Sequence, residues 1–155
     1  NNLNLNNYSN KFSLENTLGN YTNNGQIGRI IGKDGLISIY LWSYDGQYPI
    51  AEIKNATYSE VETAVKTLFG VINIDALSKL AIPNETKLKD GDLQKTLPKA
   101  LITTYTYKPL VGMTSMTDPR GTTTTYEYDS FGRLSKVKDA NGKLINTYDY
   151  HYQNQ

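Results

Sequence analysis

The 155-residue sequence contains no cysteine and a single histidine, His151. Without cysteine the chain forms no disulfide and offers no thiolate to a metal ion. One histidine in a tyrosine-rich stretch has no partners for a zinc site or a catalytic triad. Neither a GxSxG nor an HExxH sequence is present. We therefore expect no metal site, no cofactor and no enzymatic activity.

An excess of one charge and long apolar runs are also lacking. Lysine and arginine total 16 and aspartate and glutamate 15, so the net charge is only +1. Such a balance does not neutralise a phosphate backbone, and we expect no nucleic-acid partner. No run reaches 18 apolar residues, so no membrane-spanning helix is expected. The sequence begins at Asn1 and shows no signal peptide, which suggests a piece of a longer exported polypeptide.

Tyrosine, by contrast, is abundant, with 13 residues. Tyrosine and threonine favour strands, because flat and β-branched side chains suit a pleated surface. The first 25 residues are instead rich in asparagine, which competes for backbone hydrogen bonds. We interpret residues 1–25 as an irregular lead-in, or alternatively as an edge strand that docks onto a neighbouring repeat. Residues 26–54 predict a three-stranded meander, because two Asp-Gly turns separate three β-rich runs.

Residues 55–100 predict a small helical insert that covers or caps the sheet. Thr57 and Glu60 have the spacing of a capping box, and Gly70 is placed to end the helix. We expect helices around residues 57–69, 75–81 and 92–97, the last two ending before prolines. The predicted fold class is therefore mainly β with a small helical insert, built from antiparallel β-hairpin repeats.

In residues 101–155 five candidate strands alternate with turn residues. Asp118 and Asp139 lie 21 residues apart, and each is followed three residues later by glycine and then by two alternating tyrosines. A period near 20 residues indicates stacked hairpin units. For the last hairpin we predict a three-residue loop with Gly142 in the left-handed conformation. That loop sets Val137 opposite Ile145 and Leu134 opposite Tyr148.

These repeats resemble the YD-repeat, or rearrangement-hotspot (Rhs), family. The residues that carry the resemblance are Asp118-Pro-Arg-Gly121, Tyr126-Glu-Tyr-Asp129, Gly132-Arg-Leu134 and Asp139-Ala-Asn-Gly142. The upstream run SYDGQYPIAEIKNATYSEVE also looks like the C-terminal portion of large YD-repeat proteins from Bacteroidetes-type bacteria. The resemblance implies a large, secreted or surface-exposed β-rich protein whose hairpins spiral into a long sheet. The chain lacks the RYYDP-type motif that closes the shell in toxin-bearing members.

Seven tyrosines are the candidate ligand or packing face. We expect them to form aromatic ladders between stacked hairpins, with a stacking platform for sugars as the alternative. Glu127 and Asp129 alternate onto one strand face, where a pair of carboxylates could in principle support glycoside hydrolysis. We expect both to be solvated. We interpret Asp118-Pro119 as a turn and not as a self-cleavage site. The seven tyrosines are Tyr105, Tyr107, Tyr126, Tyr128, Tyr148, Tyr150 and Tyr152.

The function expected from the sequence is a non-enzymatic structural module of a secreted or cell-surface YD-repeat protein, outer-membrane associated. Its partners would be preceding repeats of the same long polypeptide. The alternatives are a carbohydrate- or cell-surface-binding module that recognises surface glycans, and part of a toxin-delivery shell or cargo of an outer-membrane secretion complex.

Overall fold

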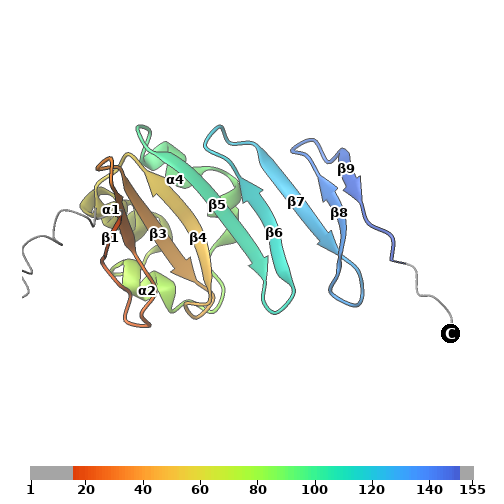
Figure 1. Cartoon of the computed structure of the whole chain (residues 1–155), viewed down its shortest axis with the longest axis horizontal. Coiled ribbons are helices and arrows are strands. Elements are labelled where there is room, and N and C mark those ends of the chain that lie inside the picture. Colours follow the sequence, from red (N-terminus) through yellow and green to blue (C-terminus); the bar gives the residue numbers. More distant parts are fainter. Residues whose placement is uncertain (1–15, 151–155) are drawn as a thin grey trace, which may run out of the picture.

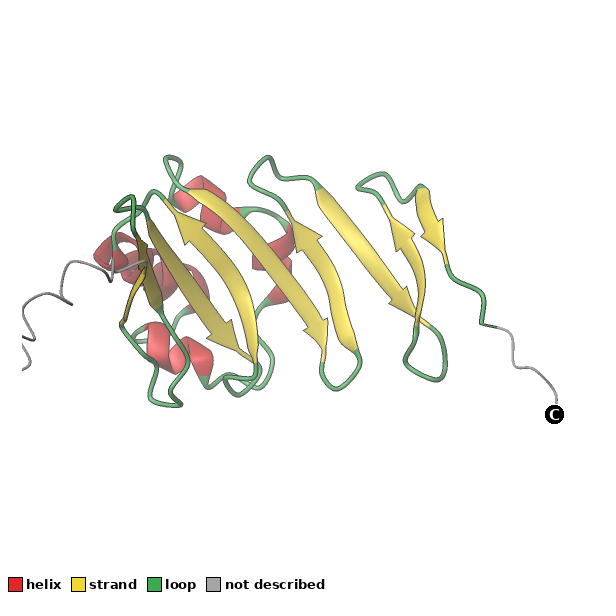
Figure 2. Cartoon of the chain, viewed as in Figure 1, coloured by secondary structure: helices red, strands yellow, loops and turns green. Residues whose placement is uncertain are grey.

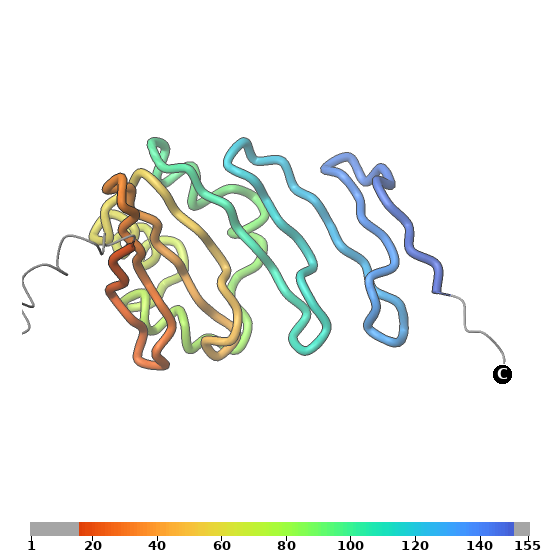
Figure 3. Tube along the Cα trace, viewed as in Figure 1, coloured from red at the N-terminus to blue at the C-terminus, as the bar shows by residue number. Residues whose placement is uncertain are grey.

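The computed structural model describes residues 16–150, which form one twisted antiparallel sheet with four helices packed on one face (Figures 1 and 2). The sheet runs in chain order from β1 to β9 without a crossover, so each strand pairs with the strands before and after it (Figure 3). This arrangement confirms the predicted mainly β fold with a small helical insert. The strands are β1 (Asn16–Gly19), β2 (Arg29–Gly32), β3 (Ile37–Ser43), β4 (Tyr48–Lys54), β5 (Leu101–Lys108), β6 (Gly112–Thr117), β7 (Thr123–Tyr128), β8 (Leu134–Lys138) and β9 (Leu144–Thr147).

The first helix, α1 (Tyr58–Phe69), has the ends that the sequence predicted. Thr57 accepts a hydrogen bond from the Glu60 backbone N–H, and the Glu60 carboxylate accepts one from the Thr57 N–H at 2.7 Å. These bonds satisfy donors that a free helix end would leave unpaired. Gly70 ends the helix at φ 68°, a left-handed conformation that costs glycine little.

Three shorter helices follow: α2 (Ile74–Ser78), α3 (Glu85–Lys89) and α4 (Asp92–Thr96). The sequence predicted α2 and α4 within a few residues but missed α3. Pro83 lies two residues before α3, and the Asn84 side chain caps this helix by accepting a hydrogen bond from the Lys87 N–H at 3.4 Å. Within residues 16–150, no helix has both the length and the apolar character needed to cross a membrane.

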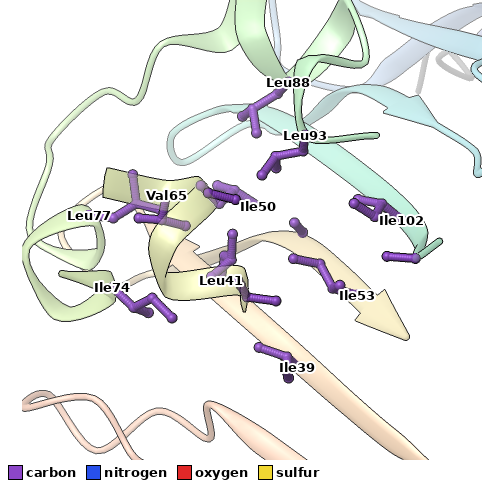
Figure 4. Close-up of a cluster of buried hydrophobic side chains, with 14 of the residues drawn as sticks. Ile39, Leu41, Ile50, Ile53, Val65, Ile74, Leu77, Leu88, Leu93 and Ile102 are labelled. Atoms are coloured by element: carbon purple, nitrogen blue, oxygen red, sulfur yellow. The ribbon is translucent and has the colours of Figure 1, made fainter. Parts of the chain in front are cut away.

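The core lies between the helices and the N-terminal half of the sheet (Figure 4). Directly opposed residues of an antiparallel pair share a face, so Ile39, Ile53 and Ile102 form one apolar row across β3, β4 and β5. All three are 2% exposed or less. Val65 of α1 and Leu88 of α3 cover this face and are fully buried. Burial of each such side chain contributes about 1.5–3 kcal/mol.

The same face turns polar towards the C-terminal strands. The neighbouring row begins with Leu41 and Ala51 and continues with Thr104, Thr117 and Thr123. The Thr104 hydroxyl donates to the Leu88 carbonyl at 2.7 Å, and the Thr117 and Thr123 hydroxyls are 2.9 Å apart. Figure 1 shows that β7, β8 and β9 extend beyond the helices. The insert therefore covers one part of the sheet and leaves the last hairpins open on both faces.

The predicted irregular lead-in needs a correction. Residues 16–19 form β1, which pairs with β2 and places Leu18 opposite Ile30. Backbone pairing with β2 outweighs the low strand propensity of asparagine. The alternative expected an edge strand docked onto a neighbouring repeat, whereas β1 pairs with β2 of the same chain. Residues 1–15 lie outside the described part of the chain.

The predicted register of the last hairpin is wrong beyond its turn. Gly142 is left-handed at φ 77°, as predicted, and Lys138 lies opposite Leu144. A bulge then inserts Ile145, so Val137 lies opposite Asn146 instead. Leu134 does not face Tyr148 either, since the Tyr148 N–H donates to the Ser135 carbonyl at 2.9 Å.

We predict that Leu41→Ala destabilises the fold by about 2–5 kcal/mol, because it removes a fully buried side chain from the core. Leu36→Ala is the matched control, since Leu36 is 68% exposed, and it should change stability by less than about 0.5 kcal/mol. Urea unfolding followed by circular dichroism measures both. Equal effects of the two substitutions would contradict this placement of the core.

Candidate functional site

Three turns in the C-terminal hairpins share one geometry: Asp118–Gly121, Asp129–Gly132 and Asp139–Gly142. In each, the glycine N–H donates to the aspartate carbonyl at 2.9–3.0 Å. One carboxylate oxygen of each aspartate also accepts from the backbone N–H groups two and four residues later, at 2.8–2.9 Å. The carboxylates thus bind their own turns. Asp118-Pro119 is part of such a turn, as the sequence predicted.

The second of these turns carries an additional ion pair. Arg133 Nε donates to the second carboxylate oxygen of Asp129 at 2.8 Å, and a terminal guanidinium nitrogen lies 2.7 Å from the same oxygen. The Arg133 backbone N–H, followed by its side chain, lowers the pKa of Asp129 below its ordinary value of 3.8. Asp129 is therefore held ionised, and its lone pairs are directed at the turn and at one arginine.

Glu127, the other carboxylate of the candidate hydrolytic pair, is held on the sheet. It lies opposite Lys136 on β8, and its carboxylate contacts the Lys138 ammonium group. The hydrogen bond from Lys138 lowers the pKa of Glu127. Each carboxylate thus has a cation of its own, Lys138 for Glu127 and Arg133 for Asp129. Neither has the raised pKa that a general acid needs near neutral pH.

Tyr128 reaches back from β7 to the start of the preceding strand, β6. Its hydroxyl donates to the Met113 carbonyl at 2.8 Å, and its ring lies over Gly112. A Cβ added at Gly112 would lie 2.8 Å from the ring carbon that bears the hydroxyl. A glycine is therefore needed where this aromatic ring crosses the backbone.

Tyr150 makes the corresponding contact one repeat later. Its hydroxyl donates to the Leu134 carbonyl at 3.0 Å, and the Arg133 guanidinium lies 4.3 Å from its ring centroid. The two acceptors, Met113 and Leu134, are 21 residues apart, and the two tyrosines are 22 apart. The extra residue is the Ile145 bulge. Each tyrosine therefore ties its strand to the strand before it, across one Asp-x-x-Gly turn.

Tyr107 belongs to a separate cluster with Tyr44 and Tyr48. Its ring stacks on Tyr48 at 4.7 Å and meets Tyr44 edge-on at 5.8 Å. The Tyr44 hydroxyl accepts from the Tyr107 N–H at 3.0 Å and donates to Glu85 at 2.7 Å. Burial raises the pKa of Tyr107 to about 12, and burial with the Glu85 hydrogen bond raises that of Tyr44. The cluster joins two hairpin tips to α3.

Tyr105 and Tyr126 lie on the face of the sheet opposite the helices. Tyr105 is opposite Met116, and Tyr126 is opposite Val137. Burial, followed by the nearby charge of Glu52, raises the pKa of Tyr105. Tyr40, on the same face, donates to Glu52 at 3.1 Å. Half-buried aromatic rings thus line this open face at intervals.

The predicted set of tyrosines does not form one continuous ladder. In the described part of the chain, direct ring–ring contacts occur within the Tyr44 cluster, whereas the C-terminal tyrosines pack on glycine, arginine and valine. Tyr148 is 41% exposed, and Tyr152 and His151 lie outside the described residues. Sequence reasoning missed Tyr44, Tyr48 and Glu85, because nothing local indicates contacts between such distant segments.

Metal binding and an open groove are the two remaining possibilities for a site. Among residues 16–150, no group of three or more histidine, cysteine, aspartate or glutamate side chains is placed to hold a metal ion. An open groove of about 450 Å³ lies between α1 and the α4–β5 connection. Its hydroxyls Thr63 and Thr67 donate to carbonyls of their own helix, and Glu60 is engaged at the helix cap. The groove therefore presents no convergent polar groups to a ligand.

We predict that Tyr128→Phe lowers the free energy of unfolding by about 0.5–1.5 kcal/mol, because the Met113 carbonyl loses its donor. Tyr126→Phe is the matched control on the same strand and face, since the Tyr126 hydroxyl makes no hydrogen bond within residues 16–150, and its effect should stay within about 0.5 kcal/mol. Denaturant unfolding of the two variants makes the comparison. An equal loss in both would show that the Tyr128 hydroxyl does not secure the hairpins.

The comparison with known proteins agrees with this geometry. The family model described as RHS Repeat matches residues 112–144, which span β6 to the start of β9. No curated protein matches the chain. The matched stretch contains all three Asp-x-x-Gly turns and the Tyr128 contact. These C-terminal hairpins, residues 112–144, therefore match the Rhs, or YD-repeat, family.

Proposed function

We propose that the chain is a non-enzymatic structural module of a secreted or cell-surface YD-repeat protein. The observation that carries this proposal is the repeated tyrosine contact, in which Tyr128 and Tyr150 each donate to a carbonyl of the preceding strand of the sheet. A contact that recurs with the period of the repeat is what an extendable stack requires. The partners of the module are then further repeats of the same polypeptide.

The state of the charged groups supports a structural role. The carboxylates of Asp118, Asp129 and Asp139 accept backbone N–H bonds within their turns, and Glu127 is paired with lysine. Catalytic carboxylates are usually held so that one of them keeps a proton near neutral pH. Hydrogen bonds and a cation lower the pKa of Asp129 and of Glu127, which suits a structural role better than proton transfer.

The helical insert has a complementary role in this proposal. It buries the helix-facing side of β3, β4 and β5, where the rows of the sheet are apolar. A repeat sheet needs a covered end, because an open apolar face or edge invites association. We assign the insert to closing one side of the sheet while the C-terminal hairpins continue the repeat. The export signal and outer-membrane association inferred from the family resemblance stay predictions.

Duplicating one repeat tests the structural role. A second copy of residues 118–138 inserted after Lys138 supplies two turns and two strands in phase with Asp139. We expect the copy to join the sheet and raise the melting temperature by about 2–4 °C, as roughly 1 kcal/mol of added stability would at this chain length. Far-ultraviolet circular dichroism should show a matching gain in β structure.

The control for the duplication is a glycine-serine insert of the same length at the same position. It adds chain without the turn aspartates or the tyrosines, so it should leave the melting temperature unchanged or lower it. If limited proteolysis removes the duplicated copy as readily as the control insert, the repeats do not stack and the structural proposal fails.

A second candidate is a glycan-binding module, favoured by the aromatic residues on the open face. Tyr40, Trp42, Tyr105 and Tyr126 are each partly exposed on the side without helices. Flat aromatic rings at a surface suit stacking against the apolar faces of sugar rings. The partner under this candidate is a surface polysaccharide and not a protein repeat.

Glycan-array binding distinguishes this candidate. If the open face binds sugar, Tyr126→Ala should reduce binding at least tenfold while circular dichroism shows the fold intact. Phe131→Ala is the control, since Phe131 is an aromatic residue that is 73% exposed on the turn between β7 and β8. Absence of binding by the unmodified chain, or equal loss in both variants, would remove this candidate.

A further inference from the structure

The β9 strand forms an open edge of the sheet. It pairs with β8 alone in the described part of the chain, and its four residues are all exposed. Leu144 and Ile145 are 49% and 53% exposed, and Tyr148 just beyond is 41% exposed. No proline interrupts the stretch from Lys143 to Tyr150. An uncovered edge with apolar side chains favours pairing with another strand.

The backbone of β9 has unpaired groups on its outer side. The Tyr148 N–H donates inward to the Ser135 carbonyl at 2.9 Å. Successive residues of an antiparallel strand direct their backbone groups alternately to the two sides, so Thr147 directs its N–H and C=O to the open side. A strand added at this edge would therefore find donors and acceptors in place.

The sequence of this edge is complementary to itself. The segment reads KLINTYD from Lys143 to Asp149. In an antiparallel pair centred on Asn146, Lys143 of one copy lies opposite Asp149 of the other, Leu144 opposite Tyr148, and Ile145 opposite Thr147. Opposite charges and apolar pairs across strands are favourable, whereas like charges directly opposite are not. We propose that, where this edge is uncovered, it pairs with the β9 edge of a second copy of the chain.

Other registers fit less well. A two-fold axis moved to Thr147 would place Ile145 opposite Asp149 and leave Lys143 without an acidic partner. A two-fold axis at Ile145 would place Lys143 opposite Thr147 and leave Asp149 without a basic residue opposite it. The Asn146 register places Lys143 opposite Asp149 and Leu144 opposite Tyr148, and it sets no like charges opposite one another. Antiparallel pairing about this axis makes two copies of each contact and joins the two nine-stranded sheets with their helices on one side.

The charges of this edge are available for such a contact. In residues 16–150, neither Lys143 nor Asp149 forms an ion pair, although seven other lysines and arginines pair with acidic groups within their own strands, hairpins or helices. The Lys143 backbone N–H donates to Asp139, and this bond does not involve the Lys143 side chain. Changing the charge at either position therefore leaves the last turn intact.

Charge reversal at the edge tests the proposal. Sedimentation equilibrium of the full 155-residue chain should show a monomer–dimer equilibrium whose dissociation constant rises with salt. Lys143→Glu alone and Asp149→Lys alone should each raise that constant about tenfold or more, since each variant places like charges opposite one another. The double variant should restore dimerisation, and an equimolar mixture of the two single variants should form a heterodimer.

Two further variants complete the test. Lys33→Glu makes the same charge change on an exposed turn far from β9, and it should leave the dissociation constant unchanged. Thr147→Pro removes an outward N–H from the edge, so it should abolish the dimer while circular dichroism shows the sheet intact. A chain that stays monomeric at millimolar concentration, polymers larger than a dimer, or a dimer indifferent to the reversals at Lys143 and Asp149 would each overturn the proposal.

Discussion

In each of the three Asp-x-x-Gly turns, one carboxylate oxygen of the aspartate accepts two backbone N–H groups, and these bonds hold the shape of the turn. In the turn that starts at Asp118, this oxygen holds the N–H groups of Arg120 and Thr122, and the left-handed Gly121 completes the reversal. The direction of the next strand follows from these bonds, because they fix the backbone on both sides of the turn. Near the N-terminus the Thr22 hydroxyl accepts from the Gln26 N–H in the same way. The turn geometry therefore tolerates different oxygen acceptors and extends beyond the stretch that the family model matches.

The second constraint is the change from an apolar to a hydroxyl-bearing surface along one row of the sheet. Leu41 and Ala51 need a cover, and the insert supplies it, whereas Thr117 and Thr123 satisfy each other. Because threonine suits a strand without needing burial, the sheet can continue past the helices with little apolar surface to hide. The repeat region then relies on tyrosines that bond to the preceding strand and on turns that fix the spacing of the strands.

The sequence predicts what local chemistry determines. The capping box of α1, the left-handed glycines and the strand content follow from residues close together in the chain. The register of the last hairpin does not, because the Ile145 bulge places Val137 opposite Asn146 even though pairing with Ile145 buries more apolar surface. The cluster around Tyr44 could not be predicted from the sequence either, since Tyr44 and Tyr107 are 63 positions apart. Contacts of this kind depend on the whole sheet, which no local pattern encodes.

The open β9 edge connects the structural role with self-association. A following repeat and a second copy of the chain would both add an antiparallel strand outside β9, and they would use the same outward N–H and C=O groups of Thr147. The two arrangements are therefore mutually exclusive at one edge. Repeat stacking within one polypeptide has the advantage of high effective concentration, because its next strand is tethered a few residues away. Pairing of two copies is then confined to chains in which that edge is uncovered, and its strength depends on concentration while that of the stacked repeats does not.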